Sequence, residues 1–476
     1  MKLYATPRAE INARMEGGRV VAVEIVPRAD RTVRLLRLRP HSPLEERHAH
    51  GRMLRKHLGR AMLGRWKAPP GRADPVETVL RAEHGRLPKL LPIKHGRMAV
   101  SPFGFFRGSV AIMAADLATL PFTGLGVQIC GDAHVRNLGA FAAPDGHLVF
   151  DVDDFDETTR GPWEWDLKRL ATSFVLAGRE AGMRDRACVD AVGDLARWYR
   201  TALARFAEMP FLRLERYEIH RHTQSGPVRA ILQKAERSMP QQVLAKLTMG
   251  AERGAPHFAT RRPVLLREPP STARLVVGSL KGYRDTLSAE RQLVLDRYRP
   301  VDVAFKVVGT GSVGSRDYVV LALGRGVRDP LMLQVKESFP SAYAPYVGDD
   351  GMHPGRRVAE GQRRMQTWSD PLIGWTSIGR RPFLVRQLSD HKASVEPDEL
   401  RGAALQEYAA VCGEVFAKAH ARTGDAAAIG AYCGAGTRFD RALGRFAVAY
   451  ADQTTADYER WVGAIRAGRV PVRRGV

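Results

Sequence analysis

Segments typical of β-strands are concentrated in one window of this chain, between two longer stretches with helical periodicity. In residues 300–395 the apolar runs are short, β-branched and bounded by turns, as in VAFKVV, DYVVLALG and PLMLQVKES. The flanking stretches instead favour amphipathic helices such as WEWDLKRLATSFVLAGREAGM. The chain therefore predicts an α+β fold with two lobes, a mostly helical large lobe and a small antiparallel β lobe.

A chain of 476 residues is too long for one ordinary domain. We expect residues 1–45 to form an N-terminal extension and residues 46–299 to form the helical catalytic lobe. Residues 300–395 would form the small β-rich lobe, and residues 396–476 would add helices that pack on the catalytic lobe. The chain has no apolar run of eighteen residues and no apolar N-terminal segment, so we expect neither a membrane span nor a secretory signal. Four cysteines without metal-type spacing fit reduced thiols in a cytoplasmic protein.

The chain carries 74 Lys and Arg against 51 Asp and Glu, a net charge of +23. Such a chain attracts anions, including nucleotides, phosphorylated metabolites and nucleic acid. The basic residues are spread along the sequence, without a zinc finger or an aromatic–basic RNA-binding pattern. A specific nucleic-acid partner is therefore not favoured.

Two polar motifs flank a short predicted hairpin in the catalytic lobe. Residues 130–141 read CGDAHVRNLGAF, and residues 150–157 read FDVDDFDE. Asp132 can orient an acceptor hydroxyl and take its proton, and Asn137 can bind Mg²⁺ through a neutral oxygen. Crowded carboxylates on the next strand repel one another unless a cation neutralises them. The pattern favours magnesium-dependent phosphoryl transfer, and its alternative is an ordinary hydrogen-bonded turn.

The segment GDAHVRN resembles the catalytic loop GDxHxxN of aminoglycoside phosphotransferases and other protein-kinase-like enzymes. The segment DFDE resembles their metal-binding motif. This resemblance implies that Asp132 is the catalytic base and that Asn137 and Asp154 hold the metal. Asp151 and Asp153 match the metal motif less well.

The resemblance also implies two supporting residues. His134 would form hydrogen bonds within the catalytic loop, and Asp166 would anchor that loop from the helix WEWDLKRLA. These motifs, together with PIKHGRMAVSPFGFFRGS and VGTGSVGSRDY, resemble the bacterial domain-of-unknown-function 2252 family. That likeness extends over nearly the whole chain beyond residue 45.

A glycine-rich loop and a lysine predict the nucleotide site. Gly309, Gly311 and Gly314 fit G-x-G-x-x-G, and a strand follows them instead of the helix that a dinucleotide-binding unit requires. Strand–glycine loop–strand is the protein-kinase arrangement above the phosphates. The next strand carries Lys336, which in that pattern contacts the phosphates and an acid on the following helix, here Glu360. The alternative is a plain hairpin followed by an edge-strand lysine in solvent.

In conventional kinases the glycine loop and the lysine precede the catalytic loop, whereas here they follow it. A circular permutation would account for this order, because the site need not follow the order of the chain. The resulting hypothesis is an ATP- and Mg²⁺-dependent phosphotransferase that acts on an unidentified hydroxyl of a small molecule or a protein. The alternatives are a non-catalytic nucleotide-binding pseudokinase, an AMP transferase and a basic nucleic-acid-associated protein.

Three basic residues precede the catalytic loop, in the segment KHGRMAVSPFGFFRG. Lys94, Arg97 and Arg107 could bind an anionic acceptor. They could equally form salt bridges with the carboxylates of residues 153–157. The sequence leaves both interpretations open.

Overall fold

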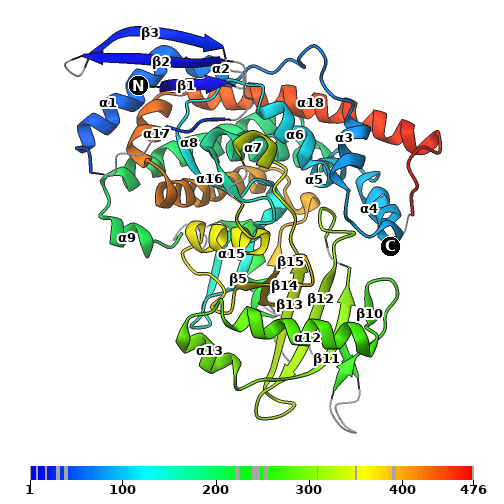
Figure 1. The fold of residues 1–476 in the computed structure, drawn as a ribbon. Coiled ribbons are helices and arrows are strands. Elements are labelled where there is room, and N and C mark those ends of the chain that lie inside the picture. The colour runs from blue at the N-terminus through cyan, green and yellow to red at the C-terminus, as the bar shows by residue number, and fades with distance from the viewer. Residues whose placement is uncertain are drawn as a thin grey trace.

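The computed structural model has a helical part and a smaller part built on a β-sheet (Figure 1). The chain is thus α+β with antiparallel sheets, as expected. Along the described chain, no helix has the length and apolar character needed to cross a membrane. The described residues are 2–6, 9–16, 19–27, 33–36, 41–219, 225–237, 247–249, 256–307, 309–348, 351–388 and 393–473.

Both ends of the chain contribute to the helical part. α16 packs along α8, α18 packs on α7 and α8, and α1 packs on α17. The helices of this part are α1 (Leu44–His57), α2 (Arg60–Leu63), α3 (Pro75–Ala82), α4 (Leu91–Met98), α5 (Pro102–Gly108), α6 (Val110–Leu117), α7 (Trp163–Glu180), α8 (Asp185–Glu208), α9 (Phe211–Glu215), α10 (Gly226–Glu236), α16 (Ala403–Thr423), α17 (Ala426–Cys433) and α18 (Arg438–Arg466).

Short strands lie among these helices and carry the two polar motifs. β4 pairs with β7, and β5 pairs with both β6 and β16, in each case antiparallel. The strands are β4 (Gly126–Ile129), β5 (Leu138–Ala142), β6 (Leu148–Val152), β7 (Thr159–Pro162) and β16 (Ala393–Ser394). A separate N-terminal antiparallel sheet contains β1 (Lys2–Thr6), β2 (Ala9–Glu16) and β3 (Arg19–Pro27). Two further strands, β8 (Thr248–Met249) and β9 (His257–Phe258), form a short pair.

The sheet part contains a six-stranded antiparallel sheet in the order β10-β11-β12-β13-β15-β14. Its strands are β10 (Leu265–Arg267), β11 (Arg299–Lys306), β12 (Asp317–Leu323), β13 (Pro330–Glu337), β14 (Gly374–Ile378) and β15 (Arg381–Gln387). Its helices are α12 (Pro270–Arg284), α13 (Ala289–Leu295) and α15 (Pro354–Met365), whereas the short α14 (Ala344–Val347) contacts β7 of the helical part. α12 contacts β11 and β14, and α15 contacts β14 and β15.

The sheet part begins upstream of the boundary expected at residue 300. β10 pairs with β11, and α12 buries Val276 and Tyr283 in the same hydrophobic cluster as strand residues of the sheet. These segments have helical or irregular local patterns, and only long-range pairing assigns them to the sheet. At the other end β16, although inside the expected window, pairs with β5 of the helical part.

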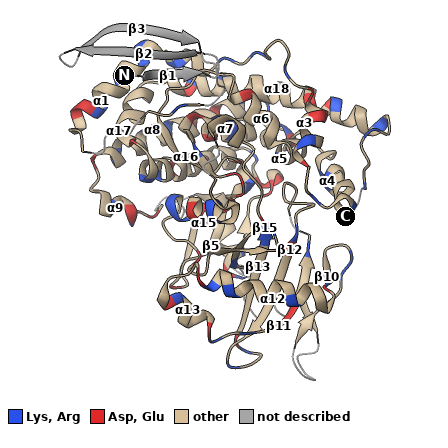
Figure 2. Cartoon of the chain, in the orientation of Figure 1, with Lys and Arg blue, Asp and Glu red and all other residues tan. Residues whose placement is uncertain are grey.

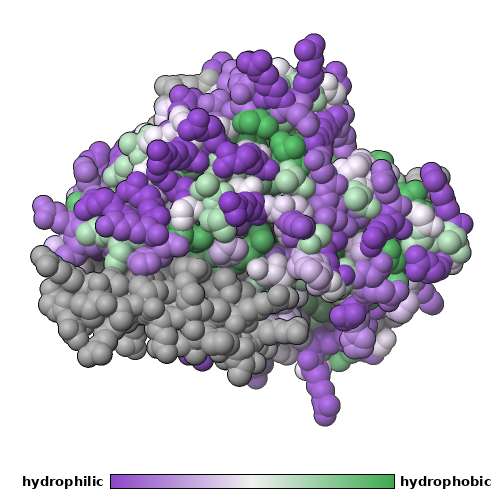
Figure 3. Space-filling model, turned by 90° about the horizontal axis from the view of Figure 1, so that it is seen from above, coloured by the Kyte–Doolittle hydropathy of each residue, from purple (hydrophilic) through white to green (hydrophobic). Residues whose placement is uncertain are grey.

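The positive charge is dispersed over the molecule. Figure 2 shows Lys and Arg on helices and strands of both parts, interspersed with Asp and Glu. The face shown in Figure 3 is mostly hydrophilic, with small apolar patches between charged side chains. In this view the described Lys and Arg residues do not gather in a single stripe.

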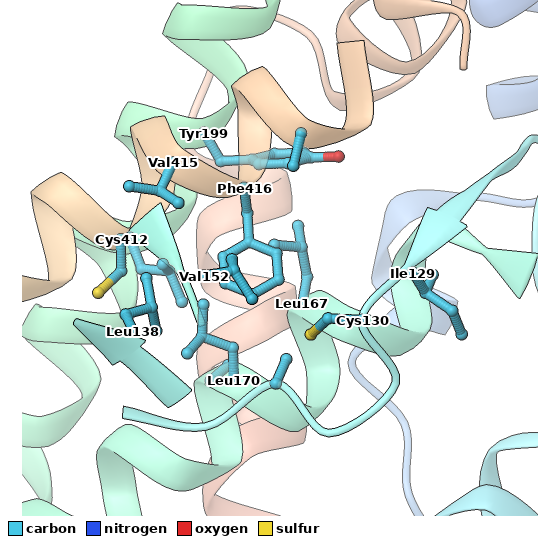
Figure 4. Close-up of a cluster of buried hydrophobic side chains, with 14 of the residues drawn as sticks. Ile129, Cys130, Leu138, Val152, Leu167, Leu170, Tyr199, Cys412, Val415 and Phe416 are labelled. Atoms are coloured by element: carbon cyan, nitrogen blue, oxygen red, sulfur yellow. The ribbon is translucent and has the colours of Figure 1, made fainter. Parts of the chain in front are cut away.

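A hydrophobic cluster lies beneath the two polar motifs and fixes the strands that carry them. Figure 4 shows side chains from β4, β5, β6, α7, α8 and α16 converging in this cluster. Its labelled members are Ile129, Cys130, Leu138, Val152, Leu167, Leu170, Tyr199, Cys412, Val415 and Phe416. Each of them is at most 1% exposed, so the backbone that presents the polar motifs rests on close-packed side chains.

Candidate active site

The loop between β4 and β5 is held from below by Asp166, in the first turn of α7. The two carboxylate oxygens of Asp166 accept hydrogen bonds from the backbone N–H groups of Cys130, at 2.8 Å, and Gly131, at 3.0 Å. His420 on α16 lies 3.4 Å from the same carboxylate. Gly131 has φ +82°, and a Cβ there would lie 2.4 Å from the carbonyl oxygen of Glu157, so the turn requires glycine. Asp166 thus binds the backbone at the start of this loop from α7.

Asp132 is held by an arginine that the sequence reasoning missed. Arg169, one turn after Asp166 on α7, donates from Nε to Asp132 Oδ1 at 2.7 Å. Arg169 is fully buried, and its Nη2 also donates to the carbonyl of Phe106 at 3.0 Å. Burial raises the pKa of Asp132, and the charge of Arg169 opposes that rise. The sequence does place Arg169 on the buried side of an amphipathic helix, and a buried arginine indicates that an acidic partner lies nearby.

His134 stays within the loop. Its Nδ1 accepts a hydrogen bond from the backbone N–H of Arg136 at 3.2 Å, and its Nε2 lies 3.9 Å from Asp132 Oδ2. Burial, together with nearby arginines, holds the pKa of His134 well below its ordinary value, so the ring is neutral near pH 7. The ring thus shapes the loop around Asp132 without adding a charge.

The pairing of β5 with β6 brings Asn137 next to the acidic segment. Leu138 pairs with Val152, and the N–H of Asp153 donates to the carbonyl of Asn137 at 3.0 Å. The side-chain amide of Asn137 donates from Nδ2 to the carbonyl of Asp132 at 2.8 Å. That bond leaves the Asn137 Oδ1 oxygen available as a ligand.

The acidic residues after β6 have different surroundings. Asp151 forms a buried ion pair with Lys418 on α16, which removes it from the site. Asp154 faces two cavities, whereas Asp153 lines one of them. Asp156, which the sequence reasoning did not single out, forms an ion pair with Lys336. The strand pattern predicts carboxylates here, but the turn after β6 decides which of them faces the sheet part.

The glycine loop lies between β11 and β12. Gly309 and Gly314 have φ values of +62° and +94°, a backbone conformation that favours glycine. A Cβ on Gly311 would lie 3.4 Å from the carbonyl oxygen of Arg107, in ordinary van der Waals contact. Ser312 Oγ donates to Asp156 Oδ2 at 3.2 Å, which joins the loop to the acidic segment.

Lys336 on β13 is only 4% exposed and points to the acidic segment. Burial alone would lower its pKa, but the carboxylates of Asp156 and Asp154 outweigh burial and raise it. Glu360 does not supply the expected partner. Its carboxylate pairs with Arg356 and Arg364, the residues four positions before and after it on α15. Helical periodicity places Glu360 on the same side of α15 as these two arginines. The expected Lys336–Glu360 pair is therefore corrected to Lys336–Asp156.

Two cavities flank Asp154 where the helical and sheet parts meet. The first, here the Lys336 cavity, has a volume of about 500 Å³, and the second, the Arg107 cavity, of about 470 Å³. Lys336 lines only the former, while Arg107 and Asp132 line only the latter. The residues that line both are Asp154, Gly309 and Ser312. The glycine loop and the acidic segment thus form the boundary between two adjoining spaces.

The three basic residues before the catalytic loop differ in their partners. Lys94 is buried and pairs with Glu83 at 2.9 Å, and burial lowers its pKa to about 8 against the opposing effect of that carboxylate. Arg97 donates to the carbonyl of Gly309 in the glycine loop. Arg107 lies over the ring of Phe103, and among the described residues it forms no salt bridge with the acidic segment. The three residues therefore do not act as one basic cluster.

Arg86 also contacts the glycine loop and was not anticipated. Its Nη1 donates to the carbonyls of Gly311, at 2.8 Å, and Val313, at 3.0 Å. Its guanidinium lies over the ring of Phe339. The loop is thus tied to the helical part from two sides.

Residues 86–464, about four fifths of the chain, match the model of a family described as "Uncharacterized protein conserved in bacteria (DUF2252)". The chain belongs to this family. The matched range includes both polar motifs, the glycine loop and Lys336. No curated protein matches the chain, and no solved structure matches it.

Proposed function

We propose that this chain is an ATP- and Mg²⁺-dependent phosphotransferase with a circularly permuted protein-kinase-like fold. One observation carries the proposal: Lys336 pairs with Asp156 across 180 positions of sequence. This contact holds the glycine loop and its lysine against the acidic segment, which the β5–β6 pairing places beside the loop that contains Asp132 and Asn137. A glycine hairpin and a strand lysine are common separately, whereas their meeting with these acidic and amide groups is typical of phosphoryl transfer.

The order of elements in the sheet part supports a permuted kinase-like arrangement. β11, the glycine loop, β12 and the lysine strand β13 follow in that order, and α15 precedes β14 and β15. The chain then returns to the helical part, where β16 pairs with β5. The catalytic and metal motifs come earlier in the sequence, so the two lobes have exchanged their order.

The Lys336 cavity suits a nucleotide. Its volume of about 500 Å³ lies within the usual range for small-molecule sites. The glycine loop and Lys336 would bind the phosphates, and the end of β15, with Gln387 and Leu388, would border the base. The segment FLVRQLSDHK, residues 383–392, would be the strand that leads into a hinge, and its last four residues, 389–392, lie outside the described residues.

The acidic and amide oxygens suit Mg²⁺ bound together with phosphates. In the described portion of the chain, no group of three or more His, Cys, Asp or Glu side chains could hold a metal ion. Mg²⁺ commonly uses one or two carboxylates together with substrate phosphates, and Asn137 and Asp154 offer such a partial set. Bound there, the ion would neutralise negative charge on the transferred phosphoryl group.

Asp132 has the position of the group that receives the acceptor proton. Arg169 binds its Oδ1, which fixes the carboxylate, while the side chain remains 18% exposed towards the Arg107 cavity. A hydroxyl in that cavity would lie on the opposite side of Asp154 from Lys336. Asp132 would orient this hydroxyl and accept its proton as the oxygen bonds to phosphorus.

Asp132→Asn tests the enzymatic part of the proposal. The variant should bind ATP·Mg²⁺ like wild type in calorimetric titration, because Asp132 does not line the Lys336 cavity. Its ADP release, with water or another hydroxyl as acceptor, should fall roughly 10²–10⁴-fold. Wild-type protein that binds ATP·Mg²⁺ but releases no ADP with any acceptor would indicate a pseudokinase.

Mass spectrometry of the products separates phosphate transfer from AMP transfer. The phosphotransferase predicts ADP and an acceptor heavier by one phosphoryl group. AMP transfer instead predicts pyrophosphate and an adenylylated acceptor. Wild-type protein that binds no nucleotide with or without Mg²⁺ would remove the basis of both.

A further inference from the structure

The Arg107 cavity is a partly open pocket, one side of which is formed by helices. It extends from Asp132 and the glycine loop to α3, the junction of α5 with α6, and residues 337–346 after β13. Its volume of about 470 Å³ is suited to a small molecule. Because Asp132 lines this cavity, a molecule bound there can present a hydroxyl to the proposed base.

Two other cations that line this cavity, Lys94 and Arg86, have partners in the described chain. Lys94 is paired with Glu83, and Arg86 donates to carbonyls of the glycine loop. The Nε atom of Arg107 is buried and has no hydrogen-bond partner among the described residues. A buried N–H group without an acceptor is costly to a fold unless a ligand satisfies it. Burial lowers the pKa of Arg107 to about 10 and the nearby Arg136 acts in the same direction, while the carboxylates of Asp132, Glu396 and Glu180 oppose the shift.

The start of α6 adds hydrogen-bond donors beside Arg107. Gly108, Ser109, Val110 and Ala111 line the same cavity. The backbone N–H groups of Val110 and Ala111 open α6 and have no backbone acceptor within the described chain. A helix N-terminus and a guanidinium together offer the donors that a carboxylate or phosphate requires.

We propose that the Arg107 cavity binds a small hydroxyl-bearing acceptor through its single anionic group, a carboxylate or a phosphate. This inference rests on the proposed phosphotransferase function. Arg107 and the first N–H groups of α6 bind the anion, and the acceptor hydroxyl faces Asp132. The acceptor oxygen forms a bond to the γ-phosphorus of ATP, and the bond from that phosphorus to the β–γ bridging oxygen breaks. ADP leaves with the electron pair, and Asp132 takes the hydroxyl proton.

Calorimetry with an occupied nucleotide site tests the anion site directly. The protein is first saturated with Mg²⁺ and a non-hydrolysable ATP analogue, so that the γ-phosphate position is filled. Glycerol 3-phosphate, glycerate and glycerol are then titrated in turn. The two anions should bind to wild type, and neutral glycerol should bind at least tenfold more weakly.

Arg107→Gln removes the charge and should weaken binding of both anions about 10- to 100-fold, as expected for charge-assisted hydrogen bonds. Arg107→Lys should recover part of the loss. Arg213→Gln removes one exposed charge from α9, which lies on the opposite side of the helical part from α3 (Figure 1), and should bind as wild type does. Circular dichroism and melting curves of the variants establish that they are folded.

The outcomes separate this inference from the function on which it rests. If the ATP analogue does not bind, the phosphotransferase proposal fails, and titration of inorganic phosphate into the nucleotide-free protein still tests Arg107. Equal binding of glycerol and glycerate, or anion binding that Arg107→Gln leaves unchanged, overturns the inference. Absence of anion binding by wild type in both the nucleotide-bound and nucleotide-free protein overturns it as well.

Discussion

Lys336 on β13 and Asp156 after β6 form an ion pair that joins the sheet part to the helical part. Burial alone would raise the pKa of Asp156, but the ammonium group of Lys336 outweighs burial and lowers it. The Asp156 side chain remains 36% exposed, whereas that of Lys336 is only 5% exposed. The lysine is therefore the buried partner, and it depends on the acidic segment for its charge.

Lys336→Met should weaken binding of ATP·Mg²⁺ by at least about tenfold, because the charge that faces the phosphates is lost. Glu360→Gln is the matched control. Within the described chain the Glu360 carboxylate forms salt bridges with arginines of α15, so its loss should leave nucleotide affinity within about twofold of wild type. Calorimetric titration of both variants decides the assignment. A larger loss in Glu360→Gln than in Lys336→Met would restore Glu360 as the functional partner.

Asp154→Ala should abolish most of the effect of Mg²⁺ on ATP affinity. Asp154 lines both cavities, and a carboxylate there can hold an ion that also contacts the phosphates. Asp145→Asn, in the exposed hairpin between β5 and β6, is the control carboxylate and should behave as wild type. The measurement is ATP affinity with and without Mg²⁺. Equal Mg²⁺ dependence in Asp154→Ala and wild type would show that another residue holds the metal.

Asp166→Asn should lower both stability and turnover. Both carboxylate oxygens of Asp166 accept backbone N–H groups, and an amide would turn its NH₂ group towards one of those donors. Leaving a buried N–H without an acceptor typically costs about 1–3 kcal/mol. Melting curves measure the loss of stability, and the rate of ADP release measures the loss of turnover. The affinity for ATP·Mg²⁺ is measured as well. If affinity falls as steeply as turnover, the role of Asp166 extends beyond the catalytic loop.

The local features of the site could be predicted because each depends on neighbouring residues. The glycine loop lies between two strands, as its flanking patterns indicated. The β5–β6 pair brings Asn137 next to Asp153, as expected for two short strands joined by a tight loop. Asp166 faces the loop because α7 begins directly after β7, which pairs with the strand leading into that loop.

The contacts between distant segments could not be predicted in the same way. Whether Lys336 meets Asp156 or Glu360 depends on how α15 turns against the sheet and on the turn after β6. The pairing of Arg169 with Asp132 likewise depends on how α7 packs beneath the catalytic loop. Both α15 and α7 are amphipathic, and periodicity gives their buried faces without saying which polar group on that face meets which partner.

The stability of the sheet part should depend on pH through Asp317, the first residue of β12. Asp317 is 1% exposed and pairs in register with Lys336, and Gln334 donates to its Oδ2 at 2.7 Å. Burial raises its pKa to about 6, against the opposing charge of Lys336. The folded protein therefore holds this proton more tightly than the unfolded chain does. The stabilisation is fully present below the unfolded pKa of about 4 and is lost as pH rises through about 6.

Asp317→Asn should remove this dependence, because the amide resembles the protonated acid. The variant should be more stable than wild type at pH 8, by at most about 3 kcal/mol, and the difference should shrink towards pH 5. Melting temperatures of both proteins at pH 5, 6.5 and 8 provide the measurement, and Asp145→Asn again serves as the control. Asp317 Oδ1 has no hydrogen-bond partner in the described chain, so the new NH₂ group reduces part of the gain. A difference in melting temperature that does not vary with pH would show that Asp317 is ionised in the folded protein throughout this range.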